Sequence, residues 1–201
     1  MTTGDMKTGR GRSGILTSGA VTFGTLETPL GTLALAWAAE GLVCLNLVED
    51  MDTAPHGGLA LSETPVGLTP LDDASSGEPV PLAIRAAVAR YFEGGATGMN
   101  LPLAARGTDF QHRVWRALQA IPPGETRTYG DLARQLGTSA RAIGGACRAN
   151  PCLIAVPCHR VIAKDGLGGF AGDVAGRRLE VKRWLLRHEG ATAALVGTGE
   201  G

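Results

Sequence analysis

The sequence predicts a two-part α/β protein, in which a small sheet-and-helix domain precedes a helical domain with a helix-turn-helix. Three strand-like runs lie in the first half, and apolar residues at helical spacing dominate the second. The halves also differ in charge. Residues 1–100 hold five Lys or Arg against eleven Asp or Glu, and residues 101–201 hold fourteen against eight. We therefore expect an acidic domain over 21–103 and a basic domain over 104–190.

Composition narrows the class of protein. The 201 residues are 44% apolar and 19% charged, which supports a packed core and excludes wholesale disorder. No stretch approaches eighteen uninterrupted apolar residues, so no membrane-spanning helix is expected. None of the cysteines forms a CxxC pair, and the chain opens without an apolar signal segment. The four are Cys44, Cys147, Cys152 and Cys158. They predict free thiols in a reducing, cytoplasmic setting.

The N-terminal half begins with a Gly-, Ser- and Thr-rich stretch over 1–20 that predicts a flexible leader. Strand-like runs follow over 21–28, 32–38 and 42–48, and in the second of them apolar residues alternate with small or polar ones, as in a half-buried strand. An acidic, aperiodic stretch over 50–80 predicts a loop. The far end of the chain, over 191–201, predicts a flexible tail.

A helix is predicted from Leu82 onward. Four apolar or aromatic side chains fall on one of its faces, and Gly94-Gly95 should end it. These side chains are Ile84, Val88, Tyr91 and Phe92. The helix completes the acidic N-terminal domain.

Helix signals follow in the C-terminal half. Thr108 and Gln111 form a capping-box pattern before an amphipathic run that Pro122 ends. A short helix is expected from Tyr129 to the terminating Gly137, and Ser139 can cap the next one. Two short helices joined by a turn that contains glycine are typical of a helix-turn-helix.

The second of these helices carries a positive strip. Arg141 and Arg148 are seven residues apart, hence on one side, with Gly144 and Gly145 between them. Because mid-helix glycine costs about 0.5–1 kcal/mol relative to alanine, the pair suggests close packing against DNA or protein. A flat cationic strip suits a phosphodiester backbone. A merely solvated helix surface is the alternative.

Cys158 and His159 follow a short apolar run, Leu153–Val156, and Pro157. A thiol acts as a nucleophile only as thiolate, so it needs a base, and His159 is the right type of group. From spacing alone, a structural buried cysteine beside a partly exposed histidine is the commoner outcome. A zinc site from Cys147, Cys152, Cys158 and His159 is disfavoured, because the spacing fits no common zinc pattern.

Several motifs together resemble the O6-alkylguanine-DNA alkyltransferase family. They are Pro157-Cys158-His159-Arg160-Val161, Arg141–Ala146, Asn150-Pro151, and Lys182-x-Trp184-Leu185-Leu186-x-His188-Glu189, within a match over about 107–190. The resemblance implies an RNase H-like N-terminal domain and a winged helix-turn-helix in the C-terminal one. It implies direct repair of alkylated DNA by a cytoplasmic monomer. The expected partner is double-stranded DNA that contains O6-alkylguanine, with O4-alkylthymine as a further candidate, and neither cofactor nor metal is implied.

Roles carry over residue by residue from this resemblance. Cys158 would accept the alkyl group, His159 would be its base through a bridging water, and Glu189 would orient the imidazole. Asn150 would hold the surrounding loop, and Tyr129 would contact a phosphate and help protonate the departing guanine. Arg141 would fill the space left by the extruded nucleotide. The implied DNA contacts are Arg141, Tyr129, Arg148, Gly144, Gly145 and Ser139. The implied walls of the alkyl pocket are Pro157, Val161, Phe170 and Ala171.

The chain departs from the family pattern between Phe170 and Lys182, where it is about five residues longer. Arg177 and Arg178 in this stretch either lengthen the last helix or add phosphate contacts. Two other functions compete with repair. One is a non-enzymatic binder of alkylated DNA, which would lack the acceptor cysteine that is present here. The other is an unrelated thiol hydrolase, which would turn over without DNA.

Overall fold

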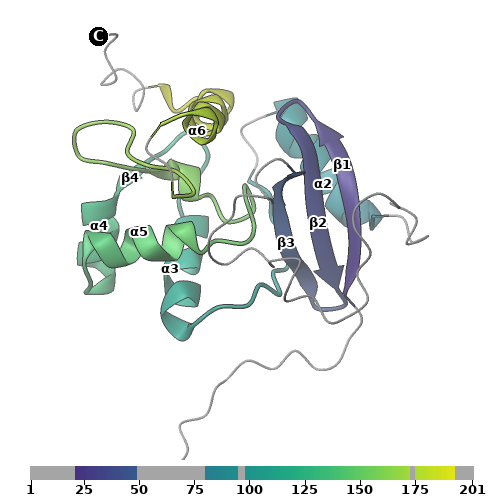
Figure 1. Cartoon of the computed structure of the whole chain (residues 1–201), viewed down its shortest axis with the longest axis horizontal. Helices are drawn as coiled ribbons and strands as arrows, with labels where there is room; N and C mark the ends of the chain where they lie inside the picture. The colour runs from purple at the N-terminus through teal and green to yellow at the C-terminus, as the bar shows by residue number, and fades with distance from the viewer. Residues whose placement is uncertain (1–20, 49–79, 95–97, 173–174, 193–201) are drawn as a thin grey trace, which may run out of the picture.

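The structure is a computed structural model, and it describes residues 21–48, 80–94, 98–172 and 175–192. The predicted leader, most of the acidic loop and most of the tail lie outside these residues. Figure 1 shows the three-stranded sheet on one side of the molecule with α2 behind it, and α3, α4 and α5 on the other side. Within the described part of the chain, no helix is long and apolar enough to cross a membrane. The predicted mixed α/β architecture is confirmed at this level.

The N-terminal sheet is antiparallel in the order β1 (Thr22–Thr28), β2 (Gly31–Ala38), β3 (Gly41–Leu47). Its strands match the predicted ones to within about one residue. Two-residue turns join them, because Thr28 pairs with Gly31 and Ala38 pairs with Gly41. Gly41 has a φ of 140°, and a Cβ there would collide with the carbonyl of Pro102. Glycine is therefore required where the 101–105 segment approaches the sheet.

Helix α2 (Leu82–Gly94) confirms the helix predicted from Leu82. The inward side chains are those that the spacing predicts, with Ile84, Val88 and Tyr91 buried and Phe92 partly buried against the core. The helix ends at Gly94, as expected for a residue that disfavours helix interiors.

The C-terminal helices also begin where their caps predict. Thr108 and Gln111 form both bonds of a capping box ahead of α3 (Asp109–Gln119). Helix α4 (Tyr129–Leu136) ends at Gly137, whose φ of 62° is left-handed, and Ser139 caps α5 (Ala140–Arg148). Further along the chain, η1 (Cys158–Arg160), β5 (Val161–Ile162) and α6 (Arg177–His188) follow, and β5 pairs in parallel with β4 (Arg127–Thr128).

Strand β3 joins the two halves through its backbone. The N–H of Leu45 donates to Pro151 O at 2.9 Å, and the N–H of Leu153 donates to Leu45 O at 2.7 Å. Leu42 exchanges a similar pair of bonds with Pro102 and Ala104. One cluster of buried apolar side chains also runs from Leu33 in the sheet to Ala191 beyond α6. The loop that leads to Cys158 is thus held against the sheet, and the boundary at 103/104 stays a prediction.

Candidate active site

Cys158 opens the short helix η1 at the end of two tight turns. The N–H of Ala155 donates to Leu153 O at 2.8 Å across Ile154, whose φ of 70° is rare for a β-branched residue. Pro157, with φ −79° and ψ 65°, forms an inverse γ-turn in which the N–H of Cys158 donates to Val156 O at 2.8 Å. The apolar run over 153–156 is buried. Together the turns fix where the thiol emerges.

Asn150 ties this loop to the thiol. Its side-chain amide donates to Val156 O at 2.7 Å and to Cys158 Sγ at 3.3 Å, while its Oδ1 accepts from the N–H of Cys152 at 3.0 Å. All three contacts lie within eight residues of Asn150. Asn150 thus links Cys152, Val156 and Cys158 within the loop that carries the cysteine.

Glu189 caps the C-terminal end of α6 and collects hydrogen bonds from three side chains. Its Oε1 accepts from His159 Nε2 at 2.9 Å, from Arg160 Nη2 at 2.8 Å and from the phenol of Tyr91 at 2.8 Å. Its Oε2 accepts from Arg160 Nε at 2.8 Å, so the ion pair is bidentate. Burial raises the pKa of Glu189, but hydrogen bonds from Arg160 and His159 outweigh it and hold the pKa near 2. Glu189 is ionised at neutral pH.

These contacts fix the tautomer of His159. Because the ionised Glu189 only accepts, Nε2 carries the proton, and Nδ1 holds a lone pair when the ring is neutral. Nδ1 is buried and has no hydrogen-bond partner within the described structure. Burial lowers the pKa of His159, against the opposing effect of Glu189, so the ring is neutral at pH 7. The alternative of a partly exposed histidine is wrong, since His159 is 0% exposed.

The Cys158 thiol is itself buried, with 5% of the residue exposed. Burial raises its pKa, while the Asn150 amide, the Lys182 charge and nearby backbone N–H groups oppose that rise. At neutral pH the resting group is a thiol, and a base must remove its proton before it can attack. No group of three His, Cys, Asp or Glu in the described ranges is arranged to hold a metal ion.

Lys182 on α6 holds the chain that follows the cysteine. Its ammonium is fully buried and donates to Val161 O at 2.6 Å, Leu167 O at 2.7 Å and Gly169 O at 3.0 Å. Burial lowers its pKa to about 8, against an opposing effect of the two thiols Cys158 and Cys147. One side chain thereby fixes the loop from β5 to Phe170, which runs beside the thiol.

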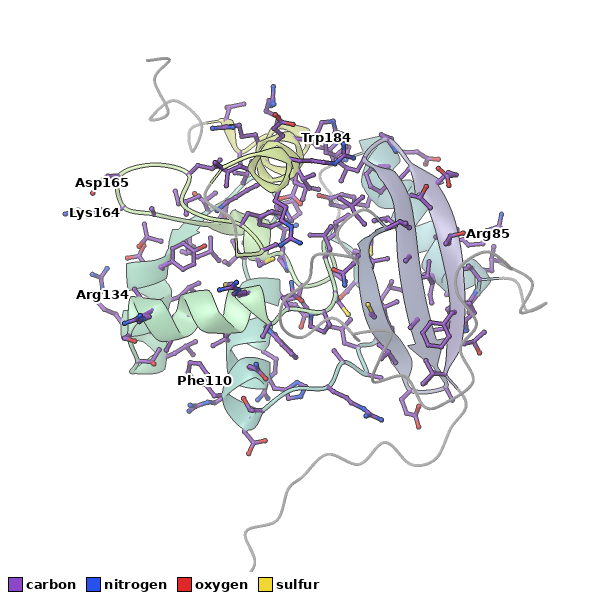
Figure 2. The ribbon with its side chains drawn as sticks, in the orientation of Figure 1. Arg85, Phe110, Arg134, Lys164, Asp165 and Trp184 are labelled. Atoms are coloured by element: carbon purple, nitrogen blue, oxygen red, sulfur yellow. The ribbon has the colours of Figure 1, made fainter. Side chains whose placement is uncertain are left out.

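A cavity of about 690 Å³ opens between α4, α5 and the loop after β5. Its lining includes Tyr129, Arg134, Ala140, Gly144 and Lys164. Figure 2 shows Lys164 and Asp165 at the tip of that loop and Arg134 on α4, all on the side of the molecule away from the sheet.

Of the six predicted DNA-contact residues, Tyr129 and Gly144 line this cavity. Arg141 and Arg148 on α5 are exposed, and nothing in the described structure lies within 4 Å of a Cβ added at Gly144 or Gly145. The glycines therefore leave a bare strip open to an external partner. Tyr129 is partly buried, and its phenol donates to Gly169 O at 3.2 Å.

The predicted pocket residues lie deeper. Pro157, Val161 and Phe170 are buried and do not line the cavity, while Ala171 is half-buried with a φ of 49°. Helix α6 starts at Arg177, so Arg177 and Arg178 lie in its first turn. Arg178 is 8% exposed and donates to Ala171 O at 2.6 Å, which makes it a support for the segment and leaves it unavailable to a phosphate.

Comparison with known proteins identifies the family. The family model described as "6-O-methylguanine DNA methyltransferase, DNA binding domain" matches residues 109–191. The methylated-DNA–protein-cysteine methyltransferase of Mycolicibacterium paratuberculosis is 37% identical over 185 residues, 87% of this chain and 98% of that protein. The chain belongs to this methyltransferase family. A second relative of that name, from Salmonella typhimurium, is 51% identical over 107 residues, and the match spans 51% of this chain and 60% of the Salmonella protein.

Solved structures of this methyltransferase family share the fold. The Mycobacterium tuberculosis O6-methylguanine methyltransferase superposes with a TM-score of 0.64 at 35% identity, covering 86% of this chain and 94% of that one. The structure of Mycobacterium tuberculosis OGT in complex with DNA gives a TM-score of 0.60 at 34% identity, covering 87% and 95%.

No role was assigned from the sequence to three residues that the structure places in the site, namely Arg160, Lys182 and Tyr91. Arg160 and Lys182 are charged residues inside apolar surroundings, and Lys182 shares its helix face with Leu179 and Leu186, a local signal that a buried partner exists. Tyr91 gave no such signal, because an aromatic residue on an apolar helix face is ordinary core. Its partner lies 98 residues away.

Proposed function

We propose that this chain repairs alkylated DNA directly, by moving the alkyl group from O6 of guanine onto Cys158, once per molecule and without a cofactor. O4-alkylthymine is a second candidate substrate. The observation that carries the proposal is a buried thiol next in sequence to a neutral imidazole, whose Nε2 is fixed by a carboxylate and whose Nδ1 has no hydrogen-bond partner among the described residues. Four free cysteines support a cytoplasmic location for this chemistry.

The proposed step balances as a single displacement. His159 Nδ1 takes the thiol proton through a bridging water, and Sγ forms a bond to the alkyl carbon as the carbon–O6 bond breaks. The electron pair stays on the guanine, which takes up a proton that Tyr129 helps to supply. Burial keeps the pKa of Tyr129 above its usual range, so the phenol retains its proton at neutral pH. The thioether product resists hydrolysis, so no second turnover follows.

The proposed DNA interface consists of α4 and α5 as a helix-turn-helix, with the loop after β5 as its wing. The N-terminal sheet and α2 form the RNase H-like unit, with the domain boundary at 103/104. Duplex DNA would lie along the bare strip of α5, with Ser139, Arg148 and the glycines against the backbone. Arg141 would occupy the space of the flipped nucleotide. Flipping costs a few kcal/mol, which the inserted side chain offsets in part.

Transfer is tested by mass spectrometry with a duplex that contains O6-methylguanine. The native chain should gain about 14 Da on Cys158, which is the mass of a methyl group less that of the hydrogen it replaces. Cys158→Ser should gain nothing and still bind the duplex, and Cys44→Ser, a buried thiol of the sheet, should react as the native chain does. Binding without any mass gain by the native chain would support the non-enzymatic binder, and repeated turnover without DNA would support the hydrolase.

The role of Arg141 is tested by comparing duplex substrate with the free alkylated base. Arg141→Ala should slow reaction with the duplex far more than reaction with free O6-methylguanine, because only the duplex requires extrusion. Arg85→Ala is the matched control, since Arg85 is exposed on α2 in the half of the molecule that carries the sheet (Figure 2). Equal slowing of both substrates would remove the finger role and leave the thiol chemistry intact.

A further inference from the structure

Tyr91 brings the N-terminal half of the chain into the hydrogen-bond network of the thiol. It is fully buried at 0% exposure on α2, and its phenol donates to Glu189 Oε1. The main chain adds a second link, because Tyr91 O accepts from His188 Nε2 at 2.7 Å. Residue 91 therefore contacts two consecutive residues at the end of α6, one through its side chain and one through its carbonyl.

The phenol shares its acceptor with the imidazole. Glu189 Oε1 accepts from Tyr91 at 2.8 Å and from His159 Nε2 at 2.9 Å. Each hydrogen bond that a carboxylate accepts stabilises the negative charge of the carboxylate and lowers the affinity of the carboxylate for a further proton. A carboxylate that lacked the phenol would attract the Nε2 proton more strongly and so favour the imidazolium form of His159. An imidazolium has no lone pair on Nδ1 and cannot act as the base.

The phenol is available for this role at every relevant pH. Burial and the charge of Glu189 raise the pKa of Tyr91 above its usual range, so the group keeps its proton. Its ring is held edge-on to Phe92, with centroids 5.3 Å apart, and tilted against His188 at 5.2 Å. Besides Glu189, the charged groups that act on His159 are Arg160, on the same short helix, and Lys182 on α6. Neither of them replaces the phenol on α2.

We propose that Tyr91 is a positioning residue for alkyl transfer: by sharing Glu189 Oε1 with His159, its phenol keeps the imidazole neutral and Nδ1 free. The inference rests on the proposed function, since it assigns the residue that tunes the proposed base. It makes the N-terminal domain a contributor to the chemistry as well as a support. The phenol of Tyr91 reaches the imidazole only through Glu189 in the hydrogen bonds that the described residues make.

The test is Tyr91→Phe, which keeps the ring and removes only the hydroxyl. We expect the acid limb of the pH profile, where the single-turnover rate of transfer from an O6-methylguanine duplex falls with decreasing pH, to shift to higher pH by about one unit. At pH values below the limb, this shift lowers the rate by about tenfold. Above the limb the rate should return to within about threefold of native. Modification of Cys158 by iodoacetamide, which needs no DNA, should show the same displacement of the limb.

Val88→Ala is the matched control, because Val88 is buried on the same helix and takes no part in the network. This substitution weakens the packing of α2 and should leave the acid limb of the pH profile at the same pH as in the native chain. An unmoved limb in Tyr91→Phe, or an equal displacement in Val88→Ala, overturns the proposal for Tyr91 while native transfer stands. Absence of methyl transfer by the native chain at every pH overturns the proposed function instead.

Discussion

Two buried charges, Lys182 on α6 and Glu189 at its C-cap, hold the two sides of Cys158 by different means. Glu189 fixes His159 and Arg160 and faces donors, among them a guanidinium. Lys182, two helical turns earlier, fixes the loop after the cysteine by donating to three backbone carbonyls, and its ammonium lies 6.0 Å from the centroid of the Tyr129 ring. The carboxylate of Glu189 is stabilised by a full opposite charge, whereas the ammonium of Lys182 is stabilised by the dipoles of carbonyl groups.

Their pKa values show what that difference does. Burial raises the pKa of Glu189, yet its partners bring it down to about 2, and the charge is secure. Burial lowers the pKa of Lys182 to about 8, and the neighbouring thiols offset this only in part. A buried charge opposite an ion of the other sign is retained firmly, whereas one surrounded by carbonyls is close to losing its proton. The Glu189 site is therefore the rigid one and the Lys182 site is the titratable one.

Removing the charge of Glu189 should have the largest effect. Glu189→Gln keeps the shape but leaves the buried guanidinium of Arg160 without a counter-ion, which should lower the free energy of unfolding by about 3–5 kcal/mol. It also leaves His159 without its anchor, so methyl transfer should fall on the order of a hundredfold. Urea unfolding and single-turnover transfer measure the two effects.

Glu180→Gln supplies the control for this change, because Glu180 is exposed on the same helix. Its free energy of unfolding should stay within about 0.5 kcal/mol of native. If Glu189→Gln were as stable as Glu180→Gln, the ion pair with Arg160 would contribute nothing, and the contrast with Lys182 would disappear.

The fold could be predicted from local signals because each of its elements carries one. Strand-like runs placed the three strands, and the cap pairs Thr108–Gln111 and Ser139–Ala142 sit where α3 and α5 begin. The positive φ of Ile154 could not be predicted, since a β-branched residue argues against it. There the hydrogen bond from Leu153 to β3 and the turn around Ile154 override the local preference.

The site was predictable only where a motif keeps its parts close in sequence. Asn150, Cys158 and His159 lie within ten residues, and the family resemblance supplied Glu189. The bond from Tyr91 to Glu189 spans 98 residues and leaves no periodicity to detect. The predicted pocket residues Pro157, Val161 and Phe170 are buried and do not line the cavity, and the sequence could not predict this because exposure depends on how the loop packs on Lys182.

Replacing Lys182 should have an intermediate effect. Lys182→Met keeps the unbranched chain but removes the donors of three buried carbonyls, so the free energy of unfolding should fall by about 1–3 kcal/mol. Because the loop beside Cys158 loses its anchor, transfer should slow by about tenfold. Arg187→Met, exposed on the same helix, should change neither quantity. A loss as large as that of Glu189→Gln would show that Lys182 has a hidden counter-charge.

The smallest effect should be a pH response that only Lys182 produces. In the folded chain its pKa is about 8, against an unshifted 10.5 when unfolded, so between these values the unfolded state binds more protons. The free energy of unfolding that this group contributes therefore rises with pH, by about 1 kcal/mol from pH 7 to pH 9.

Lys182→Met lacks this contribution. The difference in stability between the native chain and the variant should thus widen by about that amount over the same interval in urea unfolding. Glu189, ionised throughout that interval, adds no slope of its own, so the native chain and Glu189→Gln should run parallel from pH 7 to pH 9. A constant gap between native and Lys182→Met would mean that carbonyl dipoles secure the ammonium as firmly as Arg160 secures the carboxylate, and the two sites would then be held alike.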